Sequence, residues 1–76
     1  THEPLKALDG GKDGLEIYRE LIPNAVLRAC KAVLLEVGAG QSADVERLMT
    51  AAGLIEVRSV KDLGGISRVV IGLKQT

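Results

Sequence analysis

Residues 36–40, Glu-Val-Gly-Ala-Gly, are the first candidate for chemistry, because glycines let the backbone approach a bound cofactor closely. Asp62 follows at a distance that suits a ribose-binding carboxylate. However, Gln41 and Ser42 stand where a third glycine would be needed, and only one predicted hairpin remains to complete a fold that requires more strands. We therefore interpret residues 36–40 as a tight turn between a strand and a helix.

A second glycine pair, Gly10 and Gly11, precedes Lys12 and has part of the pattern of a phosphate-binding loop. Such a loop needs Ser or Thr after the lysine, whose hydroxyl holds a magnesium ion, and it needs a preceding strand. Asp13 occupies that position here, and no strand is predicted before it. This segment is interpreted as a solvated turn.

His2 and Cys30 are the only histidine and the only cysteine of the chain. A zinc site needs three or four ligands, so these two residues predict no metal site. No internal histidine can activate Cys30 as a nucleophile, and we expect it to be a small buried hydrophobe near a helix end. His2 is expected to be exposed.

Composition limits the possible partners of this chain of 76 residues. Ten basic residues balance ten acidic ones, and the basic residues are dispersed along the sequence. Tyr18 is the single aromatic residue, so the stacking surfaces of single-stranded nucleic-acid binders are missing and no direct nucleic-acid binding is expected. One cysteine excludes an internal disulfide, and no apolar run is long enough to span a bilayer. These features favour a cytoplasmic location without membrane contact.

The first part of the chain is predicted to be a loop over residues 1–12, followed by a helical region over 13–30. Asp13 and Glu16 have the spacing of a capping box at a helix start. Pro23 lacks a backbone donor and disfavours helical geometry at the preceding residue. We expect two short helices or one helix kinked at Pro23.

Residues 32–37 form a short, nearly continuous apolar run before a glycine, which is typical of a strand buried on both faces of a sheet. It is expected to be a central strand. Such a strand needs neighbours on both edges and helices on both faces, which the remaining residues do not provide. The missing neighbours are therefore expected upstream of Thr1, which makes the chain look like part of a larger domain.

Another helix is predicted over residues 42–53, with Ser42 as its N-cap and Gly53 as its left-handed stop. Beyond it, residues 55–61 and 67–73 are rich in β-branched side chains and are separated by a turn with two glycines. They predict a final antiparallel hairpin. The apolar stripe of the helix consists of Val45, Leu48, Met49 and Ala52.

Several short segments occur along the chain in a familiar order. They are Glu3-Pro4-Leu5, Ala7-Leu8-Asp9-Gly10-Gly11, Asp13-Gly14-Leu15, Leu34-Leu35-Glu36-Val37-Gly38 with Gln41, Ala51-Ala52-Gly53, Lys61-Asp62-Leu63 and Arg68-Val69-Val70-Ile71. No single segment is decisive, but the ordered set resembles the C-terminal segment of the HemK/PrmC family and covers nearly the whole chain.

The resemblance implies an α/β fold, namely the C-terminal part of a Rossmann-like, class I S-adenosylmethionine-dependent methyltransferase. The implied activity is methylation of the glutamine side-chain amide in the Gly-Gly-Gln motif of peptide chain release factors. The family's Asn-Pro-Pro-Tyr signature and its glycine-rich cofactor motif would precede Thr1, so no catalytic or cofactor-binding residue is assigned here. Glu3 and Pro4 match a segment shortly after that signature and are candidates for the substrate rim. The fragment alone is expected to be inactive.

Two alternatives remain open from the sequence. The chain could be a complete small α+β module that binds a protein partner, or part of a related methyltransferase that acts on a nucleic acid or a small molecule. A truncated domain would differ from a complete module by an uncovered sheet, through which the fragment could self-associate.

Overall fold

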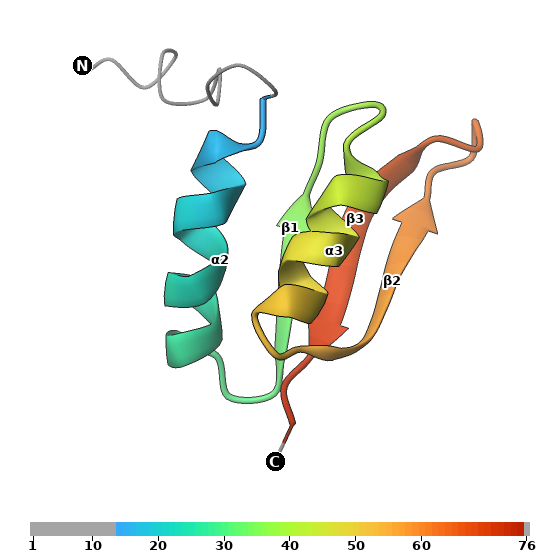
Figure 1. Ribbon diagram of the computed structural model, residues 1–76. Helices are drawn as coiled ribbons and strands as arrows, with labels where there is room; N and C mark the ends of the chain where they lie inside the picture. The colour runs from blue at the N-terminus through green and yellow to red at the C-terminus, as the bar shows by residue number, and fades with distance from the viewer. Residues whose placement is uncertain (1–13, 76) are drawn as a thin grey trace.

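The computed structural model describes residues 14–75. The predicted order of helix, strand, helix, strand and strand is present, and the last two strands form the predicted antiparallel hairpin (Figure 1). The predicted loop over 1–12 and Asp13 lie outside the described residues. The elements are α2 (Glu16–Arg28), β1 (Ala32–Glu36), α3 (Ser42–Ala51), β2 (Ile55–Lys61) and β3 (Ser67–Leu73).

The three strands form one antiparallel sheet in the order β1-β3-β2. The prediction that residues 32–37 form a central strand, with neighbours upstream of Thr1, is not tested by residues 14–75, in which β3 is the central strand. β3 has this place because it returns along the chain and inserts between β1 and β2. The ladder continues past β1, where the Val37 amide donates to the carbonyl oxygen of Arg68 over 2.9 Å.

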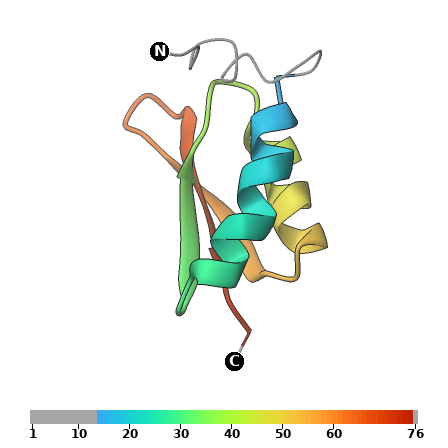
Figure 2. The same cartoon turned by 90° about the vertical axis from the view of Figure 1, so that its left-hand side faces the viewer.

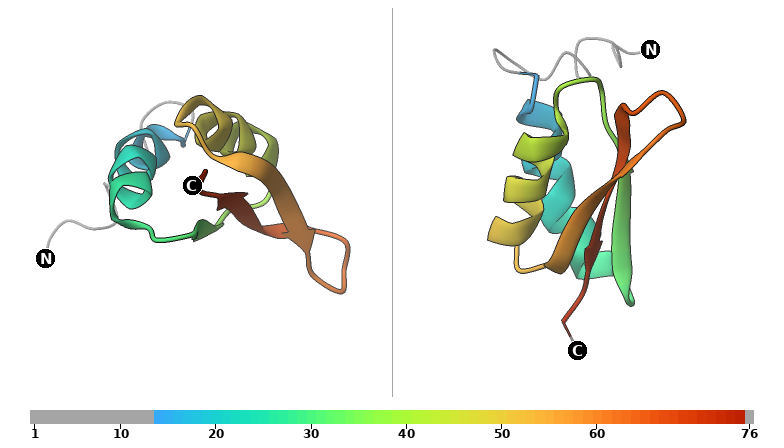
Figure 3. Two further views of the ribbon diagram at one scale, coloured as in Figure 1. Left: turned by 90° about the horizontal axis from the view of Figure 1, so that it is seen from below. Right: turned by 90° about the vertical axis from the view of Figure 1, so that its right-hand side faces the viewer.

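Both helices lie on the same face of the sheet, which gives two layers (Figure 2, Figure 3). α3 packs against β3 and β2, and α2 packs against α3 and β1. The core is entirely apolar among the described residues, so it is held by hydrophobic burial and close packing rather than by buried ion pairs. Its buried side chains are Leu15, Ile22, Val33, Val37, Val45, Met49, Leu54 and Val70.

α2 is one continuous helix that passes through Pro23, so the alternative of two short helices is not found. Pro23 is exposed, whereas the preceding Ile22 is almost completely buried in the core. Glu16 is the first residue of the helix and Leu15 is its N-cap, without a side-chain capping bond of its own, whereas Asp13 of the predicted capping box lies outside the described residues. Glu16 pairs with Arg19 one turn later, over 3.0 Å.

α3 buries its predicted apolar stripe, with Val45 and Met49 completely inaccessible to solvent. Its predicted N-cap is wrong, because Ser42 is the first helical residue and Gln41 is the N-cap. The helix ends at Ala51 rather than at Gly53, and Gly53 has the predicted left-handed conformation, with a positive φ of 99° that glycine adopts without strain.

The face of the sheet opposite the helices is open in the described part of the chain (Figure 2). Leu34 is 61% exposed there, so the expectation that this strand is buried on both faces is not met by residues 14–75. Val60 on the neighbouring hairpin is 43% exposed. β1 also has a paired strand on only one of its two edges within these residues.

The outer edge of β2 is irregular. Between Ile55 and Arg58 the chain of β2 advances three residues, whereas β3 advances only two, so β2 contains one extra, bulged residue. Glu56 in this bulge has a φ of 51°, which is uncommon for a residue other than glycine. Bulges and exposed charges on an edge strand prevent further pairing. β1 has no bulge, because its register with β3 is regular over its whole length.

Replacing Gly72 with alanine should destabilise the fold, because β3 passes closely beneath α3 at this residue. An added Cβ would lie 2.8 Å from Leu54 Cδ1 and 3.2 Å from Met49 Sδ, which forces the core to shift. We expect a loss of about 1–3 kcal/mol, the usual cost of overpacking, in urea unfolding followed by circular dichroism. Gly64→Ala is the matched control, since its Cβ would meet only Asp62 Oδ1, at 3.4 Å. Equal stability of the two variants would contradict this packing.

Candidate functional site at the carboxyl end of strand β1

Three segments lie at the end of the sheet where β1 ends (Figure 1). They are the start of α2, the turn over residues 37–41, and the hairpin turn over residues 62–66. In open α/β sheets, ligands bind outside the carboxyl ends of the parallel strands. This end of the sheet is therefore the place in the described chain where a functional site is expected.

Gln41 joins two of these segments through its side-chain amide. Its Oε1 accepts a hydrogen bond from the Gly38 amide over 3.1 Å, and its Nε2 donates to the carbonyl oxygen of Gly14 over 3.0 Å. The hydroxyl of Tyr18 lies 3.4 Å from the same Oε1 and 3.2 Å from the carbonyl oxygen of Glu36, so its proton is shared between them. The start of α2 is thus fixed to the end of β1.

The same network shows why the turn over residues 37–41 is not a cofactor loop. A glycine-rich loop binds a cofactor through free amides and the space left by missing side chains. Here the Gly38 amide is already bonded, and the position of a Cβ on Gly38 lies 3.0 Å from Gln41 Oε1. The chain's own side chain fills the turn, which supports its interpretation as a strand-to-helix connection.

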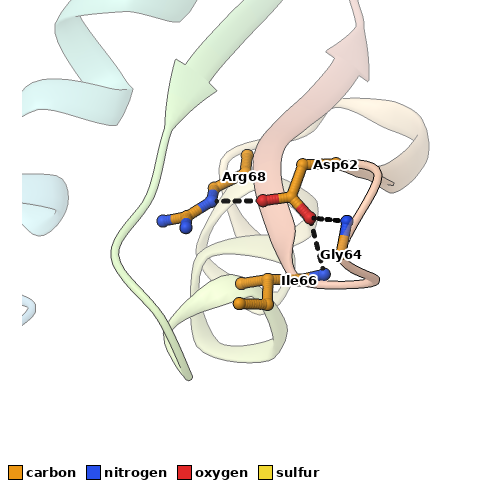
Figure 4. A network of polar contacts seen from close by, with 4 residues as sticks. All are labelled: Asp62, Gly64, Ile66 and Arg68. Atoms are coloured by element: carbon orange, nitrogen blue, oxygen red, sulfur yellow. Dashed lines mark hydrogen bonds and ion pairs between the residues drawn. The ribbon is translucent and has the colours of Figure 1, made fainter.

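Asp62 organises the hairpin turn (Figure 4). Its Oδ1 accepts hydrogen bonds from the amides of Gly64 and Ile66, over 2.9 and 3.0 Å, and its Oδ2 accepts one from Arg68 Nε over 2.8 Å. The hydrogen bond from Arg68, and then those from the two amides, hold the pKa of Asp62 below its ordinary value of 3.8. A carboxylate bonded in this way is structural, so it does not act as a ribose ligand.

A shallow apolar groove of about 200 Å³ runs between α2 and α3. Its lining contains no carboxylate, thiol or hydroxyl, so it offers no nucleophile and no general base. One positive charge, on Arg19, stands beside it. The lining residues are Arg19, Ile22, Pro23, Leu48, Ala51 and Ala52.

The residues predicted from the sequence to take part in a site do not come together in the described part. Glu3 and Pro4, like His2 and the glycine pair before Lys12, lie outside it. Cys30 is exposed rather than buried as predicted, because it lies in the connection after α2 has ended. Within residues 14–75, no group of three or more His, Cys, Asp or Glu side chains could hold a metal ion.

The sequence signal for Gln41 was weak. A polar residue in a strand-to-helix turn predicts a local bond, whereas the bond to Gly14 spans 27 residues.

No helix in the described part is long and apolar enough to cross a bilayer.

Removing the Gln41 amide should loosen this end of the sheet. Gln41→Leu keeps the size of the side chain but leaves the Gly14 carbonyl and the Gly38 amide without these partners. We expect a loss of about 0.5–1.5 kcal/mol in urea unfolding, the usual net contribution of a hydrogen bond that is not fully buried, and faster hydrogen exchange of the Gly38 amide. Gln75→Leu, at an exposed residue, is the control. Unchanged exchange at Gly38 would show that the network does not hold the turn.

The hairpin turn should weaken in acid. Because the folded pKa of Asp62 lies below its ordinary value of 3.8, the carboxylate's contribution to stability is complete above that value. It is lost as the pH falls through the lower folded pKa. NMR titration of the Asp62 carboxyl group, with hydrogen exchange of the Ile66 amide, measures this, and Asp62→Asn should lack this part of the pH dependence. A carboxyl titrating at or above 3.8 would contradict the network.

The chain is similar to known proteins in sequence and in structure. No family model matches the sequence. A protein of Caulobacter vibrioides named release factor glutamine methyltransferase is 54% identical over 96% of this chain, and one of the same name from Bradyrhizobium diazoefficiens is 47% identical over 96%. The chain spans only 26% of the length of either relative.

A solved structure agrees with the sequence matches. The crystal structure of the release-factor-specific protein-(glutamine-N5) methyltransferase from Alicyclobacillus acidocaldarius superposes with a TM-score of 0.62 and is 40% identical. The match covers 84% of this chain and 42% of that one, and it confirms the predicted α/β fold class. The chain therefore belongs to the release factor glutamine methyltransferase family, and it corresponds to about a quarter of the length of its curated relatives.

Proposed function

We propose that these residues are the C-terminal part of a methyltransferase domain whose full-length protein methylates the glutamine side-chain amide in the Gly-Gly-Gln motif of peptide chain release factors. The observation that carries the proposal is 54% identity over 96% of the chain to a protein of that name. The proposed location is the cytoplasm, where release factors act.

The catalytic and cofactor-binding residues are proposed to lie upstream of Thr1. The methyl group would come from S-adenosylmethionine, but the described residues do not fit this cofactor, since the Gly38 amide and the Asp62 carboxylate are already engaged within the chain. Glu3 and Pro4 are proposed to line the rim of the substrate site. No step of the reaction is assigned to residues 14–75.

The open sheet supports the view that the domain continues. A strand such as β1, with an apolar face exposed at Leu34 and a regular unpaired edge, is stable in a larger domain when another strand and covering elements bury it. β2 cannot serve in this way, because its edge is bulged. We propose that upstream strands extend the sheet at β1, and that the isolated chain self-associates through this surface.

The contribution of these residues to catalysis is positional. Methyl transfer to an amide nitrogen requires the amide to be held in a fixed geometry, and small displacements reduce the rate strongly. The bond from Gln41 to Gly14 fixes the point at which the upstream chain joins α2, beside the end of β1. The segment that leads to the reacting groups thus starts from a defined position.

The two alternatives fit these observations less well. A complete interaction module would bury the apolar face that Leu34 and Val60 leave open. A methyltransferase for nucleic acids or small molecules would not be expected to match proteins named for release factors at this identity over nearly all of the chain. Direct contact with nucleic acid or membrane is not proposed.

The 76-residue chain alone should not methylate a peptide that contains Gly-Gly-Gln, because the groups proposed to react are absent from it. We expect no mass increase of one methyl group when chain, peptide and S-adenosylmethionine are incubated together. The full-length protein under the same conditions is the positive control. Methylation by the isolated chain would refute the proposal that the catalytic residues lie upstream of Thr1. Inactivity of the full-length protein on both peptide and release factor would refute the proposed function.

A further inference from the structure

The hairpin turn over residues 62–66 holds two apolar side chains out into solvent. Leu63 is completely exposed, and Ile66 is 42% exposed. The turn is rigid, since the Asp62 carboxylate binds the amides of Gly64 and Ile66 as well as the Arg68 side chain (Figure 4). An apolar side chain held by a fixed turn loses little conformational entropy when a partner covers it. The hairpin tip, defined as Leu63 and Ile66, therefore has the properties of a binding anchor.

The hairpin tip lies at the same end of the sheet as the carboxyl end of β1. The bond from the Val37 amide to the Arg68 carbonyl places the start of β3 beside the end of β1. Beyond that point the turn projects away from both helices (Figure 1, Figure 3). A molecule bound over this end of the sheet would contact both the hairpin tip and the end of β1.

Extension of the sheet would leave the hairpin tip free. The regular, unpaired edge of the sheet is that of β1, whereas β2, the first strand of the hairpin, forms the opposite, bulged edge. Neighbouring strands lie about 4.8 Å apart, so β2 is roughly 10 Å away from β1. Strands added at β1 would lie farther from the hairpin tip than β1 does, so they would not cover it.

We propose that the hairpin tip contacts the body of the release factor while its glutamine reacts beside β1, an inference that rests on the proposed function. A protein partner typically buries roughly 800 Å² per side, a patch about 30 Å across, so it extends over the roughly 10–15 Å that separate the two places. A short peptide bound at the reacting site does not reach the hairpin tip. This contact would therefore distinguish the intact protein from a peptide with the same motif.

The test compares two substrates in the full-length enzyme that contains these residues. Leu63→Ser should lower kcat/KM for the intact release factor by about tenfold, the effect expected when one large apolar contact is lost. It should leave kcat/KM for a Gly-Gly-Gln peptide and the melting temperature unchanged. Leu63→Met should restore most of the activity on the release factor. Leu27→Ser is the control, because Leu27 is 79% exposed near the end of α2, at the end of the sheet away from the hairpin turn.

Each other outcome overturns the inference. Equal losses on both substrates with a lower melting temperature would mean that Leu63 packs within its own domain. Unchanged activity on both substrates would mean that the hairpin tip stays in solvent, and a change in oligomeric state would mean that a second copy covers it. Failure of the unmodified full-length protein on both substrates would instead refute the proposed function itself.

Discussion

The fold depends on the position of β3 between its two neighbours. Both other strands obtain their hydrogen bonds from β3, so neither has a paired edge within the described residues without it. Its inward side chains alternate in size, with Val70 completely buried and Gly72 leaving room for Leu54 and Met49. Because α3 packs on this strand and α2 packs on α3, the apolar core forms only when β3 is in place.

Polar side chains have a complementary role, because two of them fix the turns at one end of the sheet. The N-cap residues of the described helices, Leu15 and Gln41, make no side-chain capping bond. Instead, Gln41 secures one turn and Asp62 secures another, each through several hydrogen bonds at the same end of the sheet. These hydrogen bonds give this end of the sheet a defined geometry, but the described residues supply no reacting group there. This agrees with the proposal that the reacting groups lie upstream of Thr1.

The sequence predicted what local patterns determine. The apolar stripe of α3, the stop at Gly53 and the final hairpin follow from periodicity and turn residues, and the ordered segments identified the family. It did not predict what depends on distant residues. Strand order is set by the return of β3, the N-caps shifted by one or more residues, and the role of Gln41 depends on a bond to Gly14, far away in the sequence. The exposure of Cys30 likewise depends on where α2 ends.

The position of β3 also has a consequence for biosynthesis. Residues 67–73 follow all the other described elements in the chain, yet they occupy the middle of the sheet. While a ribosome synthesises the protein from its N-terminus, β1 and β2 emerge first and must remain unpaired with each other until β3 arrives. Sheet formation here has to wait for long-range contacts, which are slow to form. A chain that ended shortly after the hairpin turn would lose the central strand of its sheet rather than an edge strand. Quality-control proteases would recognise it as an unfolded chain.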